Sequence, residues 1–275
     1  MFKINEHTIV HFFTAHFKFV SICIDDKMYN YVSDHMLTLF LFLTFPPDTL
    51  HVYTNKASYF DQHFIKEIVQ LYNRKYMYQF HIVFYDLHSM DKAFQIVNTG
   101  EKDHTLVINS ITITEERKQH VDFSLPYFPM KQAFITHPSR KIKPQNTSAL
   151  HYTLGAVENT IHVETAKRIA QRTKQTLVII PENEYMPNVI VQGRVDLYIA
   201  DSIEAWVSED RILISHIDDA PLTHYGIMYP KGSRLVEMFN PFIRYFIRSR
   251  RYHELVRTYL KSVPQNYFES IREFE

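Results

Sequence analysis

The sequence predicts an α/β protein made of two lobes, and three observations carry this prediction. From Thr49 onward, short apolar runs with strand character alternate with segments in which apolar residues recur at helical spacing. This alternation occurs twice along the chain. A polar, proline-containing segment at 138–146 separates the two series and has the composition of a linker. Two α/β units with two chain crossings between them have the arrangement of a bilobal, hinge-bending clamp.

The first series starts with an alternating strand at 50–53, which is followed by a helix. A strand at 80–85, a short helix around 93–97 that Gly100 can end, and a buried strand at 106–108 follow. Strand, helix, strand, helix, strand is the wiring of a parallel or mixed sheet with short crossovers. The apolar residues that define the first helix are Phe64, Ile65, Ile68, Val69, Leu71 and Tyr72.

The second series repeats this wiring. Gly193 is placed to close its second helix. Because ligands gather at the carboxyl ends of strands in such sheets, we expect the chemistry to lie in the cleft between the lobes. The expected elements are a strand at 152–157, a helix at 162–174, a strand at 176–180, a helix at 186–192, a strand at 196–200 and a helix that opens at 202–207.

The end of the chain returns to the first lobe in this prediction. A strand at 223–229 precedes a long amphipathic helical stretch at 234–261, and Pro241 is expected to break that stretch. The predicted domains are therefore a first lobe at 49–137 plus 222–275 and a second lobe at 138–221. The segment at 1–48 is left unassigned, because it is aromatic-rich and glycine-free and its apolar residues follow no regular helical or strand period.

Composition excludes several classes of function. Lys plus Arg and Asp plus Glu are 30 each, so the formal net charge is zero, which argues against a whole-surface attraction to nucleic acid or anionic lipid. The single cysteine, Cys23, allows no intrachain disulfide and is expected to be a buried packing residue. The 5 glycines cannot form a Gly-rich phosphate loop. We therefore expect no cofactor.

Metal binding and membrane insertion are not favoured either. His7, His11 and His16 have partly helical spacing but no following Glu/His pattern, so ordinary surface and core histidines are a better interpretation than a metal site. The longest apolar run, 36–45, is about half of the roughly 20 residues that a spanning helix needs. It is compatible with a buried strand or helix, or with a signal-peptide core that lacks its basic flank and cleavage site.

The segment at 109–117 carries the clearest chemical signal. It starts at the carboxyl end of a predicted strand, and hydroxyl residues at Ser110, Thr112 and Thr114 precede Arg117. A guanidinium group offers a planar fork that matches a carboxylate, and neighbouring hydroxyl and amide groups can complete the shell. The alternative is a polar turn in which Thr114 caps a helix and Arg117 lies in solvent.

This segment resembles the signature of type 2 periplasmic solute-binding proteins, in the polar amino-acid branch (bacterial extracellular solute-binding protein family 3) that serves ABC importers. The matching pattern is Thr112-x-Thr114-x-x-Arg117, followed by the run Asp-Phe-Ser-Leu-Pro-Tyr at 122–127. The resemblance implies a periplasmic-binding-protein-like type II fold, two α/β lobes joined by a two-strand hinge. It also implies that Arg117 grips the α-carboxylate of a ligand, with contacts from Thr112 and Ser110.

Further landmarks follow in the order of that family, and the resemblance spans roughly 49–262. The strand and loop at 154–160 resemble those that meet the ligand carboxylate from the second lobe, which implies roles for Asn159 and Thr160. The run at 192–201 resembles the one whose last carboxylate pairs with the ligand's α-amine, which here is Asp201. The alternative for Asp201 is the N-cap of the helix that follows it.

Two features depart from the family pattern. The connection at 54–61 is short and offers only Tyr59 and Phe60 as aromatic candidates, so Tyr59 is the predicted contact for the ligand side chain. Ile161 stands where the family tends to have a hydroxyl residue, which leaves the carboxylate shell one partner short.

By resemblance, we expect a non-enzymatic protein that clamps a small zwitterion, an amino acid or related carboxylate, for ABC-type uptake or sensing. The expected protein is a monomer, periplasmic or extracellular, with an ABC-transporter permease as a partner, although no convincing export signal precedes the domain. The alternatives are a dehydratase-like enzyme of the same fold, with Glu158 or Glu182 near the strand ends as its acid or base, and a degenerate sensory module.

Overall fold

The computed structural model describes residues 9–11, 20–24, 27–31, 48–137, 139, 151–182, 184, 186–203, 213–216 and 222–260. The chain forms two compact units, Met1–Asp48 and Thr49–Glu275. The described part of the first unit is an antiparallel sheet with the order β1 (Ile9–His11), β2 (Val20–Ile24), β3 (Lys27–Tyr31). His11 and Cys23 lie in this sheet, whereas His7, His16 and the apolar run at 36–45 lie outside the described residues.

The second unit contains the two expected series of strands and helices. The first sheet is mixed, because β4 and β6 are parallel whereas β15 runs antiparallel to both of its neighbours. Its strand order is β5-β4-β6-β15-β7. These strands are β4 (Asp48–Thr54), β5 (Phe80–Asp86), β6 (Thr105–Val107), β7 (Asp122–Phe123) and β15 (Met228–Tyr229).

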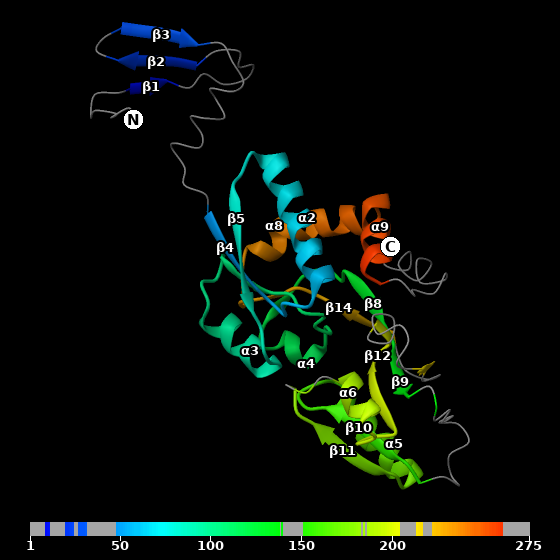
Figure 1. Ribbon diagram of the computed structural model, residues 1–275. Coiled ribbons are helices and arrows are strands. Elements are labelled where there is room, and N and C mark those ends of the chain that lie inside the picture. The colour runs from blue at the N-terminus through cyan, green and yellow to red at the C-terminus, as the bar shows by residue number, and fades with distance from the viewer. Residues whose placement is uncertain are drawn as a thin grey trace. The chain divides into compact units, whose positions relative to one another are not determined.

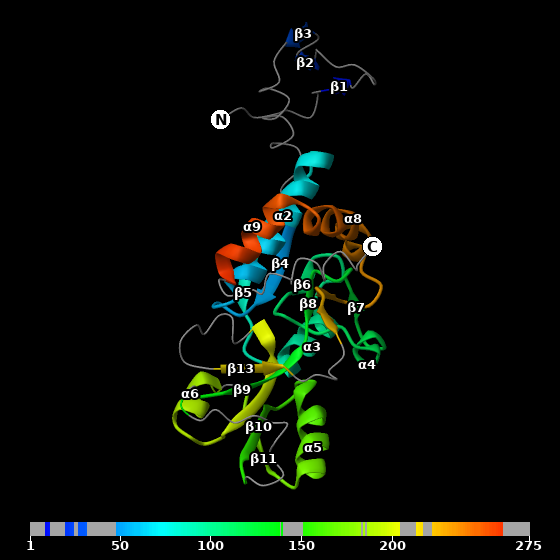
Figure 2. The same cartoon turned by 90° about the vertical axis from the view of Figure 1, so that its right-hand side faces the viewer.

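Helices cover both faces of this first sheet. Successive residues of the buried strand β6 point to opposite faces of the sheet, and both are apolar. Leu106 packs into one apolar cluster and Val107 into another. The Leu106 cluster includes α2 (Tyr59–Tyr76), α8 (Leu235–Ile247) and α9 (Arg250–Tyr259), which lie together in Figures 1 and 2. The Val107 cluster includes Ala93 and Val97 of α3 (Met90–Thr99).

We expect Phe64→Ala to cost about 3–5 kcal/mol of unfolding free energy, because it leaves a cavity at the centre of the larger cluster. The Phe64 side chain is fully buried, and its ring stacks on Tyr127 at 4.8 Å and lies 5.6 Å from Phe246. Urea unfolding monitored by circular dichroism measures the loss. Tyr245→Ala is the matched control, since Tyr245 is 66% exposed and its loss should change stability by less than about 0.5 kcal/mol. Equal effects of the two changes would contradict this assignment of the core.

The second sheet has the order β11-β10-β12-β9-β13. Its core again has two sides, since Leu197 packs with the cluster that contains α5 (His162–Thr173), whereas Tyr198 packs with residues of α6 (Met186–Val191). The strands are β9 (Gln132–Thr136), β10 (Thr153–Val157), β11 (Thr176–Ile180), β12 (Leu197–Asp201) and β13 (Leu213–His216).

Gly155 allows the close packing of this second sheet. A Cβ atom at Gly155 would lie 2.9 Å from Cδ1 of Ile180 and 3.1 Å from Cγ1 of Val195. A larger residue at this position would therefore displace the side chains that α6 packs against.

A two-stranded antiparallel ribbon connects the lobes, formed by β8 (Phe128–Met130) and β14 (Thr223–Tyr225). The predicted strand at 223–229 is therefore divided, because its first half pairs in the ribbon and its second half, β15, pairs with β7 and β6. Gly226 stands at the division, where a Cβ atom would lie 2.8 Å from the Ile113 side chain. The lobe boundaries at 137 and 222 stay predictions; β9, just before the first of them, pairs within the second sheet.

The predicted helix break at Pro241 is wrong. Helix α8 continues through Pro241 to Ile247, and the interruption comes at Ser249, whose side chain caps α9 by accepting from the Tyr252 amide. Pro241 lies on the exposed side of α8, whereas Phe239 and Phe242 beside it are buried. Burial of the apolar face outweighs the one backbone hydrogen bond that proline removes.

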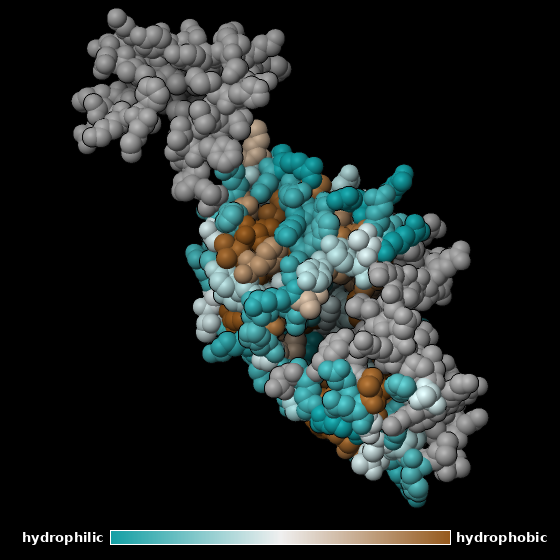
Figure 3. All heavy atoms as spheres, in the orientation of Figure 1, coloured by the Kyte–Doolittle hydropathy of each residue, from teal (hydrophilic) through white to brown (hydrophobic). Residues whose placement is uncertain are grey.

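Hydrophilic residues dominate the face of the described structure seen in Figure 3, and hydrophobic ones lie in separate patches. No helix among the described residues combines the length and apolar character needed to cross a bilayer.

Candidate functional site

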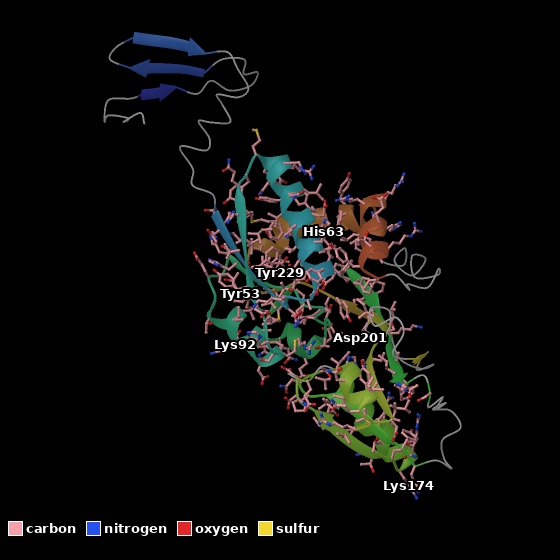
Figure 4. The ribbon with its side chains drawn as sticks, in the orientation of Figure 1. Tyr53, His63, Lys92, Lys174, Asp201 and Tyr229 are labelled. Carbon is pink, nitrogen blue, oxygen red and sulfur yellow. The ribbon has the colours of Figure 1, made fainter. Side chains whose placement is uncertain are left out.

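A cavity of about 290 Å³ lies between the lobes and receives side chains from both. The end of β12, where Figure 4 labels Asp201, contributes to it from the second lobe. The first lobe contributes Met90, Asn109, Ser110, Ile111, Thr112, Arg117 and Tyr225; the second contributes Val157, Thr160, Ile161, His162, Ile199, Ala200, Asp201 and Ile203.

Arg117 lies on the short helix α4 (Glu115–Lys118) and reaches back to the loop before it. Thr114 does cap this helix, since its hydroxyl accepts from the Arg117 amide at 3.2 Å. The guanidinium is not in solvent, however: its Nη1 donates to the Thr112 carbonyl at 2.9 Å and it lies over the Phe94 ring. Burial lowers the pKa of Arg117, and the nearby Glu116 and Asp201 oppose this shift. The arginine is therefore held at the cavity as a partly desolvated cation.

The loop that carries Ser110 and Thr112 is fixed by a buried acid, Asp61 on α2. Its Oδ2 accepts from the Ser110 amide at 2.9 Å and from the Ser110 hydroxyl at 3.2 Å. Oδ2 also accepts from the Ser58 hydroxyl at 2.7 Å, and Oδ1 accepts from the Tyr127 hydroxyl at 2.8 Å. Burial raises the pKa of Asp61, and these donors counteract the rise. Ser110 adopts a left-handed conformation with φ 50°, which the bonds to Asp61 maintain.

Asp201 faces Arg117 from the second lobe. It is buried, at 7% exposure, and its Oδ2 accepts from the Tyr225 hydroxyl at 2.7 Å. Nε2 of His162 lies 3.7 Å from the same oxygen. Oδ1 of Asp201 is also buried and has no hydrogen-bond partner among the described residues. A buried carboxylate oxygen of this kind normally requires a donor. If Asp201 instead caps the helix that follows it, its side chain would accept from the backbone amide of residue 203 or 204. Residue 204 lies outside the described residues.

The second-lobe loop brings one of its two predicted residues to the cavity. Thr160 lines it, and its hydroxyl donates to the Val157 carbonyl at 2.6 Å. Asn159 is exposed and absent from the lining; its Nδ2 donates to Asp91 on α3 at 3.2 Å. The Thr160 hydroxyl thus shapes the loop, and Asn159 connects the second lobe to the first.

Tyr59, the predicted contact for the ligand side chain, lies in the first turn of α2 and is 63% exposed. The cavity lining does not include it. The neighbouring Phe60 is buried in the first-lobe core instead. Tyr59 does not reach the cavity because the connection before α2 is too short to carry an aromatic side chain over it.

The two glutamates considered for catalysis also lie outside the cavity lining. Glu182 accepts from the Met90 amide at 2.9 Å through Oε2, so it caps α3 across the two lobes. Burial, with Asp91 and Glu158 nearby, raises the pKa of Glu182. Glu158 is exposed and accepts from the Glu182 amide at 3.2 Å. These contacts give both glutamates structural roles at the edge of the cleft.

A second cavity, of about 620 Å³, lies on the first lobe and the start of the ribbon. Its charged lining is already engaged, since Lys231 pairs with Asp122 at 2.9 Å and Lys118 with Glu115. The interlobe cavity differs because opposite charges approach it from two lobes. It is therefore the candidate site, although it is the smaller of the two.

The sequence did not predict several residues at or behind the site, among them Asp61, His162 and Tyr225. Asp61 had a detectable signal, because an acid there continues the apolar helical spacing of Phe64 and Ile65 back into the residues predicted as a connection, which the structure places in α2. His162 and Tyr225 had none, since each acts on Asp201 from a separate element.

This chain belongs to the bacterial extracellular solute-binding proteins, family 3, whose family profile matches residues 45–262. The arrangement of two mixed α/β lobes joined by a ribbon agrees with this assignment, and the predicted fold class is confirmed.

Among curated relatives, the chain is 26% identical over 179 residues to a probable histidine-binding protein of Neisseria gonorrhoeae, a match that covers 62% of this chain and 65% of that protein. It is also 26% identical over 166 residues to an ABC transporter glutamine-binding protein of Bacillus subtilis (strain 168), covering 59% and 60%. The matches thus span somewhat less than two thirds of these relatives.

Among solved structures, the chain is similar to an ancestral amino acid-binding protein that is a precursor of cyclohexadienyl dehydratase. The TM-score is 0.63 at 19% identity, covering 82% of this chain and 99% of the other. At this identity the likeness shows the fold alone.

Proposed function

We propose that this protein is a solute-binding protein that clamps a small zwitterion, an amino acid, between its lobes without transforming it. The proposal rests on one observation: Arg117 and Asp201 line the same cavity from opposite lobes, and Oδ1 of Asp201 has no hydrogen-bond partner among the described residues. A guest that carries a carboxylate and an ammonium group can neutralise both, and it can do so only when the lobes are closed.

The cavity favours a small guest. Its volume of about 290 Å³ lies at the low end of the roughly 300–1,000 Å³ range of ligand pockets. Ser110 and Thr112 are proposed to contribute polar groups on the first lobe, and Thr160 on the second. The curated relatives named as histidine-binding and glutamine-binding proteins are consistent with this class of guest.

The wider role follows from the family. We propose that the protein acts outside the cytoplasm as a monomer and presents its ligand to an ABC-type permease or a sensor. A catalytic role is not favoured, since Glu182 and Glu158 are engaged in hydrogen bonds outside the cavity lining.

A thermal-shift screen of the amino acids tests the binding proposal. A ligand at 100 times its Kd adds about 2.7 kcal/mol to stability, which corresponds to a rise in Tm of roughly 5–10 °C for a chain of this size. At least one free amino acid should give such a rise, and its amide with a blocked carboxylate should not. The absence of a shift with every amino acid at millimolar concentration would contradict the proposal.

A further inference from the structure

We infer that the amino acid taken by this site has an uncharged, aliphatic side chain; the inference rests on the proposed function and narrows it. The lining contains only one acid, Asp201, and one permanent cation, Arg117, among the described residues. The α-ammonium and α-carboxylate of the guest occupy these two groups. No second fixed charge then remains in the described lining to receive a charged side chain.

The other acids near the cavity, Asp61, Asp91 and Glu182, do not belong to its described lining. Asp61 lies behind Ser110 and accepts from three different side chains and one amide. Glu182 accepts from the Met90 amide through Oε2, while its buried Oε1 has no hydrogen-bond partner among the described residues, and Asp91 accepts from Asn159. A lysine or arginine side chain would therefore meet no second acid in the described lining, and an unpaired charge is costly to desolvate.

An acidic side chain is disfavoured by the same reasoning. Arg117 is the only arginine or lysine in the described lining, and it is occupied by the α-carboxylate. His162 is the other side chain of the described lining that can become positively charged, and its Nε2 lies 3.7 Å from Asp201 Oδ2, so it is already associated with an acid. A second carboxylate on the guest would lie close to Asp201 without a cation of its own.

Apart from these charged groups and the polar residues Asn109, Ser110, Thr112 and Thr160, the described lining is mostly apolar and comes from both lobes. It matches an aliphatic side chain, which gains free energy in proportion to the apolar area removed from water. The only rings among its described residues are those of Tyr225 and His162, which both interact with Asp201. The large apolar side chains are Met90, Ile111, Val157, Ile161, Ile199 and Ile203.

Ile161 is the most informative of these residues. It lies at the N-cap position of α5, where it lines the cavity but makes no side-chain hydrogen bond to the helix. An acidic residue is well tolerated near a helix N-terminus, because it complements the helix dipole. Ile161→Glu should therefore fold and place a second carboxylate in the cavity.

The test is calorimetric titration of the purified chain with alanine, valine, leucine, isoleucine, arginine, lysine and glutamate. One of the four aliphatic amino acids should bind at least tenfold more tightly than any of the three charged ones. Equal or tighter binding of arginine, lysine or glutamate would overturn the inference and leave the proposed function standing. Failure of all free amino acids to bind would overturn both.

The variant supplies a second measurement on the same inference. In Ile161→Glu the ratio of the lysine Kd to the leucine Kd should fall at least tenfold. The matched control is Ile179→Glu on β11, where the side chain is 43% exposed and outside the lining, and this ratio should stay within twofold of the parent. An unchanged ratio in a folded Ile161→Glu protein would overturn the assignment of Ile161 to the part of the cavity that receives the ligand side chain.

Discussion

Replacing Arg117 by alanine should weaken amino-acid binding by roughly 30-fold to several-thousand-fold, the equivalent of about 2–5 kcal/mol. The variant would leave the ligand carboxylate in a closed cavity without its charged partner. The Arg117 side chain is already half-buried, and this burial lowers its pKa. Little additional desolvation of the arginine is then needed on binding.

The fold should survive this change. Arg117 makes one hydrogen bond from its side chain to the Thr112 carbonyl, and the α4 cap depends on Thr114 and on the amide of residue 117, which alanine retains. Circular dichroism and the unfolding midpoint should therefore stay close to those of the parent protein.

Calorimetric titration of two further variants with the ligand separates the effect of the positive charge at residue 117 from that of the guanidinium geometry. Arg117→Lys keeps a positive charge but loses the planar fork, so its affinity should fall between those of the parent and the alanine variant. Arg172→Ala, at an exposed position on α5 outside the cavity lining, should bind as the parent does. If Arg117→Ala retained affinity within about threefold, the carboxylate role of Arg117 would be excluded.

Asp201→Asn should discriminate between ligands with and without an α-amine. For an α-amino acid we expect a loss of about 1.5–3 kcal/mol, or roughly 10- to 150-fold, because a charge-assisted hydrogen bond to the ammonium is replaced by a neutral one. The deaminated analogue of the same acid should change by less than about threefold. The hydrogen bond from the Tyr225 hydroxyl can be retained by the amide oxygen, so the local structure is preserved.

Competition calorimetry against the tightest amino acid measures both losses on one protein preparation. Glu164→Gln is a suitable control, since Glu164 is an exposed carboxylate on α5 and its removal should change neither affinity. Parallel losses for the amino acid and its deaminated analogue would show instead that Asp201 supports the second-lobe structure.

Local patterns explain why much of this protein could be predicted from its sequence. The hydroxyl residues before Arg117 belong to one strand-to-helix turn, so the Thr114 cap and the position of the guanidinium follow from a few consecutive residues. Asp201 ends a strand, and strand ends in such sheets face the cleft. The alternation of strands and helices likewise determined the two α/β lobes, because each periodicity is set within a single element.

Tertiary contacts decided what those patterns left open. Helix α8 continues through Pro241 because distant residues bury its apolar face, and the strand at 223–229 divides because its two halves pair with different partners. The partners of Asp201 also come from elsewhere in the chain, since Tyr225 lies 24 residues away. Sequence alone thus determined which groups carry charge and where most strands and helices lie. Which side chains share the cavity depended on packing between elements far apart in the chain, whose free energy no local pattern contains.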